Sequence, residues 1–493
     1  MSQFDAAPPN TYAGGRDDNL RIKDGALPIN ASNDAEGDFD MVAYKRDTPL
    51  WKRIKDHSLT QMILLSIQAF CGLAMADAIA GLLGVGWLLL LLTISLRLAD
   101  TVWVVGTVRN AVSYAALAGV CFLGGPLVNK LGTKWALLIG ALTFPLRGAS
   151  FYTNSKFGNQ WFLIVGSFLE GFGTGAWYVA ESGTIMSIAP SGARGKYLAL
   201  WIVSRNLGQL IEAWPNHIDG VEGGVTPDTY IIFLIIECLA IPFALLISPL
   251  DHVVRSDGTR IRVSEKVETA QECRLIKKTW RSKLICYLLY GPSGHSSTGS
   301  WSTCLGLYFS VRARALSSLF SPFFCIVGCF GLGSILDMKS LSQRRRAQVG
   351  LITVVILDAA VYIWSIIMQL RSYRTSSSKP PGPLSQSYMY WLSSSFATDA
   401  QSNVRNGAAF RCMEAIGQAV AYGMKSKTDE SPLIGFCVTF GLMALGLPPF
   451  IVLVNNTPDR IPADVMAEEE ATEHKLEGGY EKKDDPVQVS VLG

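Results

Sequence analysis

The chain has 493 residues, of which 49% are hydrophobic and 17% are charged, and its mean hydropathy is +0.27. Soluble globular domains usually carry about 25% charged residues, so this composition argues against a soluble enzyme. The 43 Lys and Arg residues nearly balance the 40 Asp and Glu residues, which gives a net charge of +3. This balance lacks the basic excess of a nucleic-acid-binding protein, so we expect a lipid-bilayer protein with no nucleic-acid partner.

Apolar stretches that are long enough to cross a bilayer recur along the chain. A transmembrane helix needs about 20 mostly apolar residues, and the sequence predicts about twelve such helices, two of them defective. The predicted spans are Gln61–Leu82, Ala111–Leu127, Trp135–Tyr152, Trp161–Ala189, Tyr197–Ala213, Tyr230–Leu250, Leu284–Ser310 (broken), Leu316–Leu336, Val349–Leu370, Pro383–Ala397 (short), Gly407–Met424 and Leu433–Val454. The fold class is therefore an all-α integral membrane protein.

Basic residues in the short loops predict the orientation, because such loops stay in the cytosol. They occur before the first span, after the second, between the fourth and fifth, and throughout residues 251–283. Both termini are then cytosolic, although Arg312 and Arg314 lie on the predicted outer side and oppose this assignment. Nothing in the sequence distinguishes the plasma membrane from an internal membrane.

The pattern divides the chain into five parts. These are a disordered cytosolic tail (1–50), an N-terminal transmembrane bundle (51–250), a cytosolic central loop (251–283), a C-terminal transmembrane bundle (284–457) and an acidic disordered cytosolic tail (458–493). The tails lack apolar periodicity, which is typical of disorder.

An internal repeat supports two related halves. Gly208-Gln209 recurs as Gly417-Gln418, and the same shift of 209 residues places Lys196 on Arg405 and Gly124 on Gly333. Transporters are commonly built from such repeats, so we expect two bundles of six helices.

The loop between the second and third spans carries the strongest local motif, Gly125-Pro-Leu-Val-Asn129-Lys130-Leu-Gly132-Thr-Lys134. It resembles the cytoplasmic G-x-L-x-D-R-x-G-R-K loop of the major facilitator superfamily, with Asn129 in place of the usual Asp. A degenerate counterpart in the second half runs from Gly333 to Asp337 and is followed by Arg344. Glycines allow a tight turn and polar side chains can latch helix ends. The predicted latch residues are Gly125, Asn129, Lys130, Gly132, Lys134, Asp337 and Arg344; an ordinary basic loop is the alternative.

Several further segments resemble the uncoordinated-protein-like (Unc-93-like) branch of that superfamily, in its fungal form. The segments are Ala74–Ile79, Trp177–Glu181, Arg194–Trp201, Arg205–Gln209, Phe309–Leu316 and Gln386–Trp391. The resemblance covers residues 50–462 and implies a twelve-helix fold with two six-helix bundles around a central cavity. It implies less about activity, since animal members are thought to regulate channels or receptor trafficking and fungal members are mostly unassigned.

Three stretches depart from that branch. Residues 87–92 form an apolar run that is too short to span a bilayer, and residues 291–297 and 375–381 interrupt the seventh and tenth spans. Such irregular backbone cannot face lipid. Either these stretches line a cavity or the gene model is faulty; the second reading is favoured and weighs against transport.

Ionisable residues at membrane depth are the default candidates for a functional site. Arg205 has no acidic neighbour on its own helical face and needs a partner such as Asp77 or Glu181, whereas Arg411 and Glu414 are three residues apart and can neutralise each other. The candidate solute or ion contacts are Asp77, Glu181, Arg205, Asn206, Gln209, Arg411, Glu414 and Gln418. Glu170, Glu237 and Asp358 are also predicted at membrane depth, and Glu170–Gly175 is interpreted as a close helix-packing run.

No residue pattern points to catalysis. The histidines are dispersed, the cysteines form no C-x-x-C pair, and the sequence contains no nucleotide-binding loop. We therefore predict no catalytic residue, metal or cofactor. The hypothesis is a secondary transporter that moves an unknown small solute or ion by alternating access. The alternatives are a non-transporting regulator that binds another membrane protein, such as a channel or a trafficking receptor, and a non-functional chain.

Overall fold

The computed structural model describes residues 41–77, 96–190, 192–218, 227–255, 261, 263, 268, 270–281, 311–371, 382–424 and 432–462. Its long helices are α3 (Ser58–Ala69), continued by the π-helix η2 (Phe70–Ala74), α5 (Leu96–Phe122), α7 (Thr133–Phe157), α8 (Gln160–Ile188), α9 (Arg194–Ile218), α10 (Pro227–Leu246), α12 (Val311–Leu336), α13 (Gln343–Arg371), α14 (Gly382–Ser394), α15 (Ala400–Met424) and α16 (Pro432–Asn455). Shorter helices are α1 (Met41–Asp47), α2 (Leu50–Asp56), α6 (Gly124–Leu131), the 3₁₀ turn η3 (Leu250–His252) and a helix over residues 270–281.

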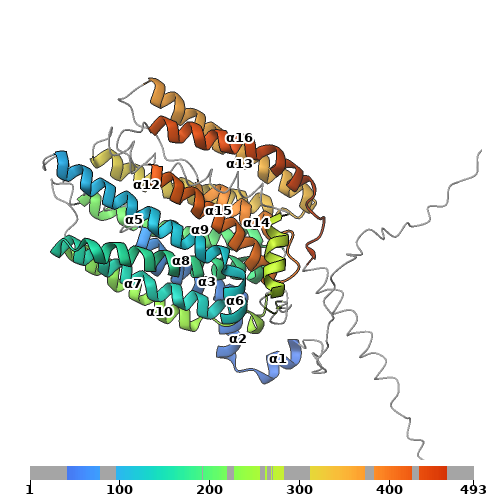
Figure 1. Ribbon diagram of the computed structural model, residues 1–493. Helices are drawn as coiled ribbons and strands as arrows, with labels where there is room; N and C mark the ends of the chain where they lie inside the picture. Colours follow the sequence, from blue (N-terminus) through green and yellow to red (C-terminus); the bar gives the residue numbers. More distant parts are fainter. Residues whose placement is uncertain are drawn as a thin grey trace, which may run out of the picture.

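The long helices lie side by side along one common direction (Figure 1). In the first half of the chain, α7 packs against α8 and α10, and α5 packs against α8. Contacts between the halves run from α5 and α8 to α15, and from α9 to α12 and α14. The pair α13 and α16 lies along one edge of the molecule (Figure 1).

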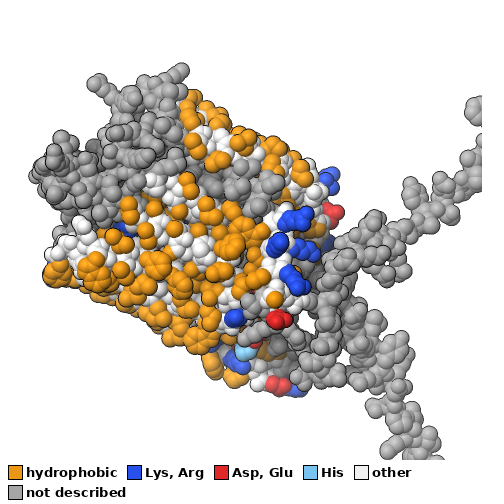
Figure 2. Space-filling model, in the orientation of Figure 1, with side chains coloured by type: hydrophobic (Ala, Val, Ile, Leu, Met, Phe, Trp, Pro, Cys, Tyr) orange, Lys and Arg blue, Asp and Glu red, His pale blue; other side chains and the backbone are white. Residues whose placement is uncertain are grey.

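Hydrophobic side chains cover much of the face seen in Figure 2, while Lys and Arg gather at one end of it. That end carries α6, the helix 270–281 and the start of α15, and we call it the basic end. Among the described residues, four helical segments are long and apolar enough to cross a membrane: Ser58–Asp77, Gln160–Ile188, Gln343–Trp364 and Cys437–Asn455. The bent pair Val108–Phe122 and Gly124–Leu131, with a 65° angle, passes the same test as a fifth span.

Small residues in α8 allow close helix packing, as the sequence predicts for Glu170–Gly175. A Cβ atom at Gly171 would collide with the Ser113 backbone of α5, and one at Gly173 would collide with the Thr143 side chain of α7. At Gly175 a Cβ atom would lie 2.8 Å from Val120 Cβ of α5. This run therefore brings α8 against two neighbouring helices.

Most of the predicted apolar stretches coincide with helices where the structure describes them. However, Ala111–Leu127 crosses the 65° bend between α5 and α6, and Tyr230–Leu250 runs past the end of α10 at Leu246. The seventh stretch, Leu284–Ser310, lies outside the described residues, as do the irregular runs 87–92, 291–297 and 375–381 and the tails 1–40 and 463–493. The tenth stretch is a helix of 13 residues, shorter than the length needed to cross a bilayer.

One boundary prediction needs correction. The sequence predicts a disordered N-terminal tail up to residue 50, yet Met41–Asp47 forms α1 and Leu50 begins α2, because a short helix needs no long apolar pattern. It also predicts a cytosolic central loop over residues 251–283; within that range, residues 270–281 form a helix and Val254 pairs with His57 in an isolated parallel bridge.

Candidate functional site

Arg411 of α15 is the most deeply buried cation of a polar cluster in the middle of the helices. Its Nη1 atom lies 2.8 Å from Glu414 Oε2 and its Nη2 atom lies 3.9 Å from Glu181 Oε2 of α8. Its Nε–H donates a hydrogen bond of 2.5 Å to the hydroxyl of Tyr390 on α14. Arg411 therefore joins two carboxylates, one from each half of the chain.

Arg205 of α9 extends this arrangement toward the start of the chain. Its Nη2 atom donates to the Tyr178 hydroxyl at 3.1 Å and lies 3.6 Å from Asp77 Oδ2. Its Nη1 atom donates to Gln386 Oε1 at 3.3 Å, and Gln386 Nε2 donates in turn to Glu414 Oε1 at 3.4 Å. A continuous chain of polar contacts therefore runs from Asp77 to Glu181.

The ring of Tyr178 lies between the two arginines. The guanidinium carbon of Arg411 is 3.8 Å from the ring centroid and that of Arg205 is 5.7 Å away, within the range of cation–π attraction. The residues of this central cluster are Asp77, Tyr178, Glu181, Arg205, Gln386, Tyr390, Arg411 and Glu414. It draws side chains from α8, α9, α14, α15 and the helical turn that follows η2.

Local backbone features bring Asp77 and Arg205 together. The π-helix Phe70–Ala74 ends three residues before Asp77, and such turns often mark functional sites because they redirect the following residues. At Gly208, one turn after Arg205, a Cβ atom would lie 2.7 Å from the carbonyl oxygen of Ala74. A glycine is required there for α9 to approach η2, and this approach places the two charged side chains in contact.

Exposure and charge are uneven within the central cluster. The Asp77 side chain is 34% exposed and that of Arg205 16%, while those of Glu181, Arg411 and Glu414 are at most 4% exposed. Three acidic side chains face two guanidinium groups. Glu181 Oε1 and Oε2 and Arg411 Nη2 are buried and make no hydrogen bond of ordinary length within the described residues, and the Trp201 indole N–H faces the Glu181 carboxyl group. The cluster therefore retains hydrogen-bonding capacity that a polar solute or water could use.

The structure brings together five of the eight candidate contact residues. Asp77, Glu181, Arg205, Arg411 and Glu414 belong to the central cluster; Arg205 pairs with Asp77, as expected, whereas Glu181 lies against Arg411. Asn206 is buried and donates to the Ile202 carbonyl of its own helix at 2.8 Å. Gln418 is buried one turn after Glu414, and the Gln209 side chain lies outside the described part of the structure.

The sequence prediction missed Gln386 and Tyr390, which it used only for the family resemblance. They are four residues apart on α14, so they share one helix face, and this spacing could have indicated them. It also missed Arg147, a basic residue inside an apolar stretch, which pairs with Glu170 at 2.9 Å.

At the basic end, Asp337 joins the two halves. Its Oδ1 and Oδ2 atoms accept hydrogen bonds from the backbone N–H groups of Gly195 and Lys196, at 2.8 and 2.9 Å. These groups open α9, where a helix N-terminus favours a carboxylate. The backbones of Gly195 and Gly333 also meet so closely that a Cβ atom on either glycine would overlap the other's carbonyl oxygen.

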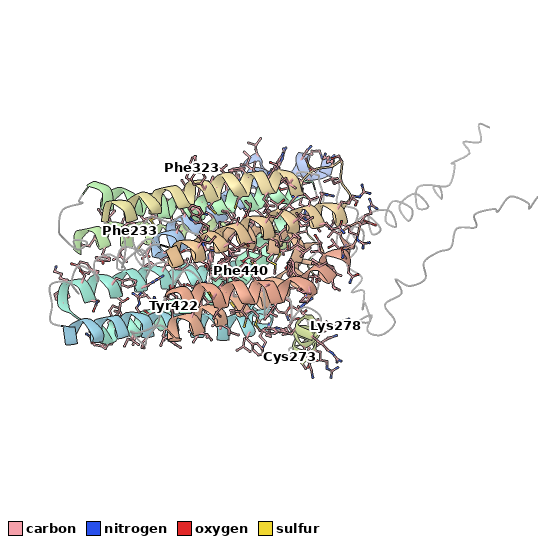
Figure 3. All side chains as sticks on the ribbon, turned by 90° about the horizontal axis from the view of Figure 1, so that it is seen from above. Phe233, Cys273, Lys278, Phe323, Tyr422 and Phe440 are labelled. Carbon is pink, nitrogen blue, oxygen red and sulfur yellow. The ribbon has the colours of Figure 1, made fainter. Side chains whose placement is uncertain are left out.

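The start of α15 contacts a carboxylate group of the helix 270–281. Arg405 Nη1 lies 3.2 Å from Glu272 Oε2 of the helix 270–281, whose residues Cys273 and Lys278 mark its place in Figure 3. Glu272 is buried, and a Cβ atom at Gly125 would lie 2.9 Å from its Oε1 atom. The helix 270–281 therefore connects the first loop motif to α15.

The remaining predicted latch residues differ in their exposure. Asn129 is buried in α6, Lys130 and Arg344 are exposed, and Lys134 is half-buried. Gly132 has a φ of +85°, a conformation that favours glycine and that separates α6 from α7.

The fold and the site together define a class: a many-helix membrane protein with an ion-paired centre to which both halves of the chain contribute. The sequence profile of the Major Facilitator Superfamily matches residues 65–422, and the chain belongs to that family. This confirms the resemblance inferred from the loop motifs.

Relatives of the Unc-93-like type confirm the narrower assignment. The chain is 24% identical over 428 residues to UNC93-like protein 1 of Arabidopsis thaliana, covering 80% of this chain and 90% of that protein. It is 23% identical over 403 residues to an UNC93-like protein of Schizosaccharomyces pombe, covering 74% and 76%. It is also 26% identical over 403 residues to the notoamide biosynthesis cluster protein O' of Aspergillus versicolor, covering 76% and 87%.

Solved structures of the superfamily share the fold. The transporter FucP in its outward conformation matches with a TM-score of 0.53 and 15% identity, covering 80% of this chain and 99% of FucP. The proton:xylose symporter XylE matches with a TM-score of 0.56 and 13% identity, covering 83% and 99%. At these identities the likeness establishes the fold alone.

Proposed function

We propose that this membrane protein is a secondary transporter in which two six-helix bundles rock around the central cluster. The observation that carries the proposal is that Arg411 and Arg205 form ion pairs and hydrogen bonds with residues of both halves in the middle of the helices. Charged groups at membrane depth are costly and usually serve a solute or ion pathway.

Through the central cluster, solute binding can be coupled to the relative arrangement of the two halves. A solute that takes over hydrogen bonds of Arg205 weakens the Arg205–Gln386 contact between the halves, because each donor serves one strong acceptor at a time. Solute binding then changes the stability of one arrangement of the halves relative to the other, which is what alternating access requires. The candidate contacts remain Asp77, Glu181, Arg205, Arg411 and Glu414, now joined by Tyr178, Gln386 and Tyr390.

The basic end supports a particular orientation in the membrane and a particular conformational state of the proposed transporter. Lys and Arg gather there (Figure 2), so the positive-inside rule favours a cytosolic location for that end and for both termini. The Asp337, Gly195–Gly333 and Glu272–Arg405 contacts hold the halves together there. We therefore assign this arrangement to a state that is closed toward the cytosol.

Comparative solute profiling tests the proposal even though the solute is unidentified. Cells that express the wild-type chain and cells that express Arg205→Ala are compared for the distribution of small solutes between cytosol and medium, at matched membrane abundance. Wild type should redistribute at least one solute and Arg205→Ala should not. Equal profiles at equal abundance contradict transport, and a lower abundance of the variant assigns Arg205 to folding instead.

A non-transporting regulator is the second candidate. The observation that favours it is the near-complete burial of Glu181, Arg411 and Glu414, in which Arg411 already lies against both carboxyl groups. A regulator of this kind would bind another membrane protein through a surface and would leave the central cluster permanently closed. Its interaction with a partner should then survive Arg205→Ala, and no solute should move.

A further inference from the structure

A second buried carboxyl group lies in the first half of the chain, apart from the central cluster. Glu237 of α10 has no exposed surface, and neither carboxyl oxygen has a hydrogen-bond partner within the described residues. It follows Phe233, labelled in Figure 3, by one helical turn on the same face. A Cβ atom at Gly148 of α7 would overlap Glu237 Oε2, so the carboxyl group fills the space that this glycine leaves.

The charged groups around Glu237 already have partners. Arg147, next to Gly148, is 2.9 Å from Glu170 Oε1 of α8, and Glu170 Oε2 accepts a 2.5 Å hydrogen bond from Ser113 of α5. Arg109 of α5, the other cation of this region, stacks on the ring of Phe151 at 4.7 Å. The helices α3 and η2 also pack against α10 and contain no charged residue; Cys71 is their ionisable group.

Burial of an ionised carboxylate without hydrogen bonds costs several kcal/mol or more, and a group in that position takes up a proton instead. We propose that Glu237 is a proton-binding site at membrane depth, and that loss of its proton makes Glu237 compete with Glu170 for Arg147. A metal cation fits this place poorly, because it needs several oxygen ligands, and the described residues contain no group of three His, Cys, Asp or Glu side chains able to hold a metal.

Exchange of Arg147 between Glu170 and Glu237 would change how the helices pack. Glu170 lies on α8 and Glu237 on α10, and both helices pack against α7, which carries Arg147. Movement of the guanidinium from Glu170 to Glu237 would loosen the α7–α8 contact and tighten the α7–α10 contact. The proton leaves to bulk water, and no other group is consumed. The site needs no solute, so it stands independently of the proposed transport.

Infrared spectroscopy of the full chain in lipid nanodiscs tests the proton site directly. A protonated carboxyl group has a C=O stretching band that is separate from carboxylate bands and shifts in heavy water. Wild type should show this band at neutral pH. In Glu237→Gln, the intensity of the band should fall by the share that one protonated carboxyl group contributes. The matched control Glu272→Gln should retain that share, since Glu272 is paired with Arg405 at the basic end. Glu170→Gln should instead weaken the band, because it frees Arg147 for Glu237.

Identical bands in wild type and Glu237→Gln would overturn the proposal. Glu237→Asp serves if the Gln variant does not fold, because it keeps a carboxyl group in a changed environment. The band should then move to a new frequency, and an unmoved band would equally contradict the assignment.

Discussion

The centre of the molecule and its basic end join the same two halves with different chemistry. At the centre, Arg411 and Arg205 hold side chains that have spare hydrogen-bonding atoms. At the basic end, the contacts are a glycine-to-glycine backbone approach and carboxylates placed at the starts of α9 and α15. In the proposed transporter, the centre would exchange hydrogen-bond partners with a solute, whereas the basic end would only open or close.

The largest expected effect comes from removal of the central cation. Arg411→Gln leaves Glu181 and Glu414 buried beside a neutral group, and loss of one partner of a buried ion pair costs about 3–5 kcal/mol. We expect a clear fall in the thermal unfolding midpoint in detergent. Arg205→Gln is the matched control, and its loss should be smaller because Arg205 and Asp77 retain exposure. Equal midpoints for all three proteins would contradict the buried-pair assignment.

The next largest effect is expected when a substitution adds a methyl group at the basic end. A Cβ atom at Gly333 would lie 2.6 Å from the Gly195 carbonyl oxygen, so Gly333→Ala should destabilise the closed end by about 1–3 kcal/mol. Gly331→Ala on the same helix is the control, since a Cβ atom there has no neighbour within 4 Å. With the exposed Cys238, Cys273 and Cys437 replaced by serine, labelling of a cysteine placed at Ala193 by a membrane-impermeant thiol reagent should rise in the Gly333→Ala background alone. Equal labelling in both backgrounds would argue against a tight closure.

The contact between the helix 270–281 and α15 should make a smaller contribution to the free energy of unfolding, and this contribution can be measured separately. Glu272→Gln, Arg405→Gln and the double variant form a thermodynamic cycle, and residues in direct contact couple by about 0.5–3 kcal/mol. We expect coupling within that range in unfolding experiments, because Glu272 is buried and 3.2 Å from Arg405. Strictly additive losses would mean that the helix 270–281 does not clamp α15.

Acidic pH should produce the smallest effect, through Asp337. Burial raises the pKa of this carboxyl above its ordinary value of 3.8, although the N–H groups of Gly195 and Lys196 lower it. The folded protein then holds the proton more tightly than the unfolded chain, so stability from Asp337 is present below 3.8 and is lost as pH rises through the raised pKa. The unfolding midpoint of wild type relative to Asp337→Asn should therefore rise on acidification. Parallel pH profiles of the two proteins would contradict this.

The sequence predicts the positions of the helices and of the buried charged residues well, but it predicts poorly which residues contact one another. Apolar stretches located the described long helices because span length is set by the bilayer. The Arg205–Asp77 contact was predictable, since Arg205 has no acidic neighbour on its own helix. The Glu181–Arg411 contact was not, because residues 230 positions apart meet only through the packing of α8 against α15.

The basic end illustrates the same limit. Asp337 was identified from its loop motif, yet the N–H groups that it binds on α9 depend on the approach of Gly195 to Gly333, which no local pattern encodes. Glu272 was missed because it lies among basic residues of an expected loop. A helix of twelve residues with Glu272 and Ile276 on one face was the available signal.

The most direct test of alternating access is a distance measured across the basic end. Spin labels attached through encoded keto amino acids at the exposed positions Leu131 and Lys339 would report, in nanodiscs, how far the two halves stand apart there. Rocking of the two halves predicts two distance populations, with the longer one enriched by Gly333→Ala and unaffected by Gly331→Ala. A single short distance in all three proteins would contradict a rocking transporter and favour a permanently closed regulator.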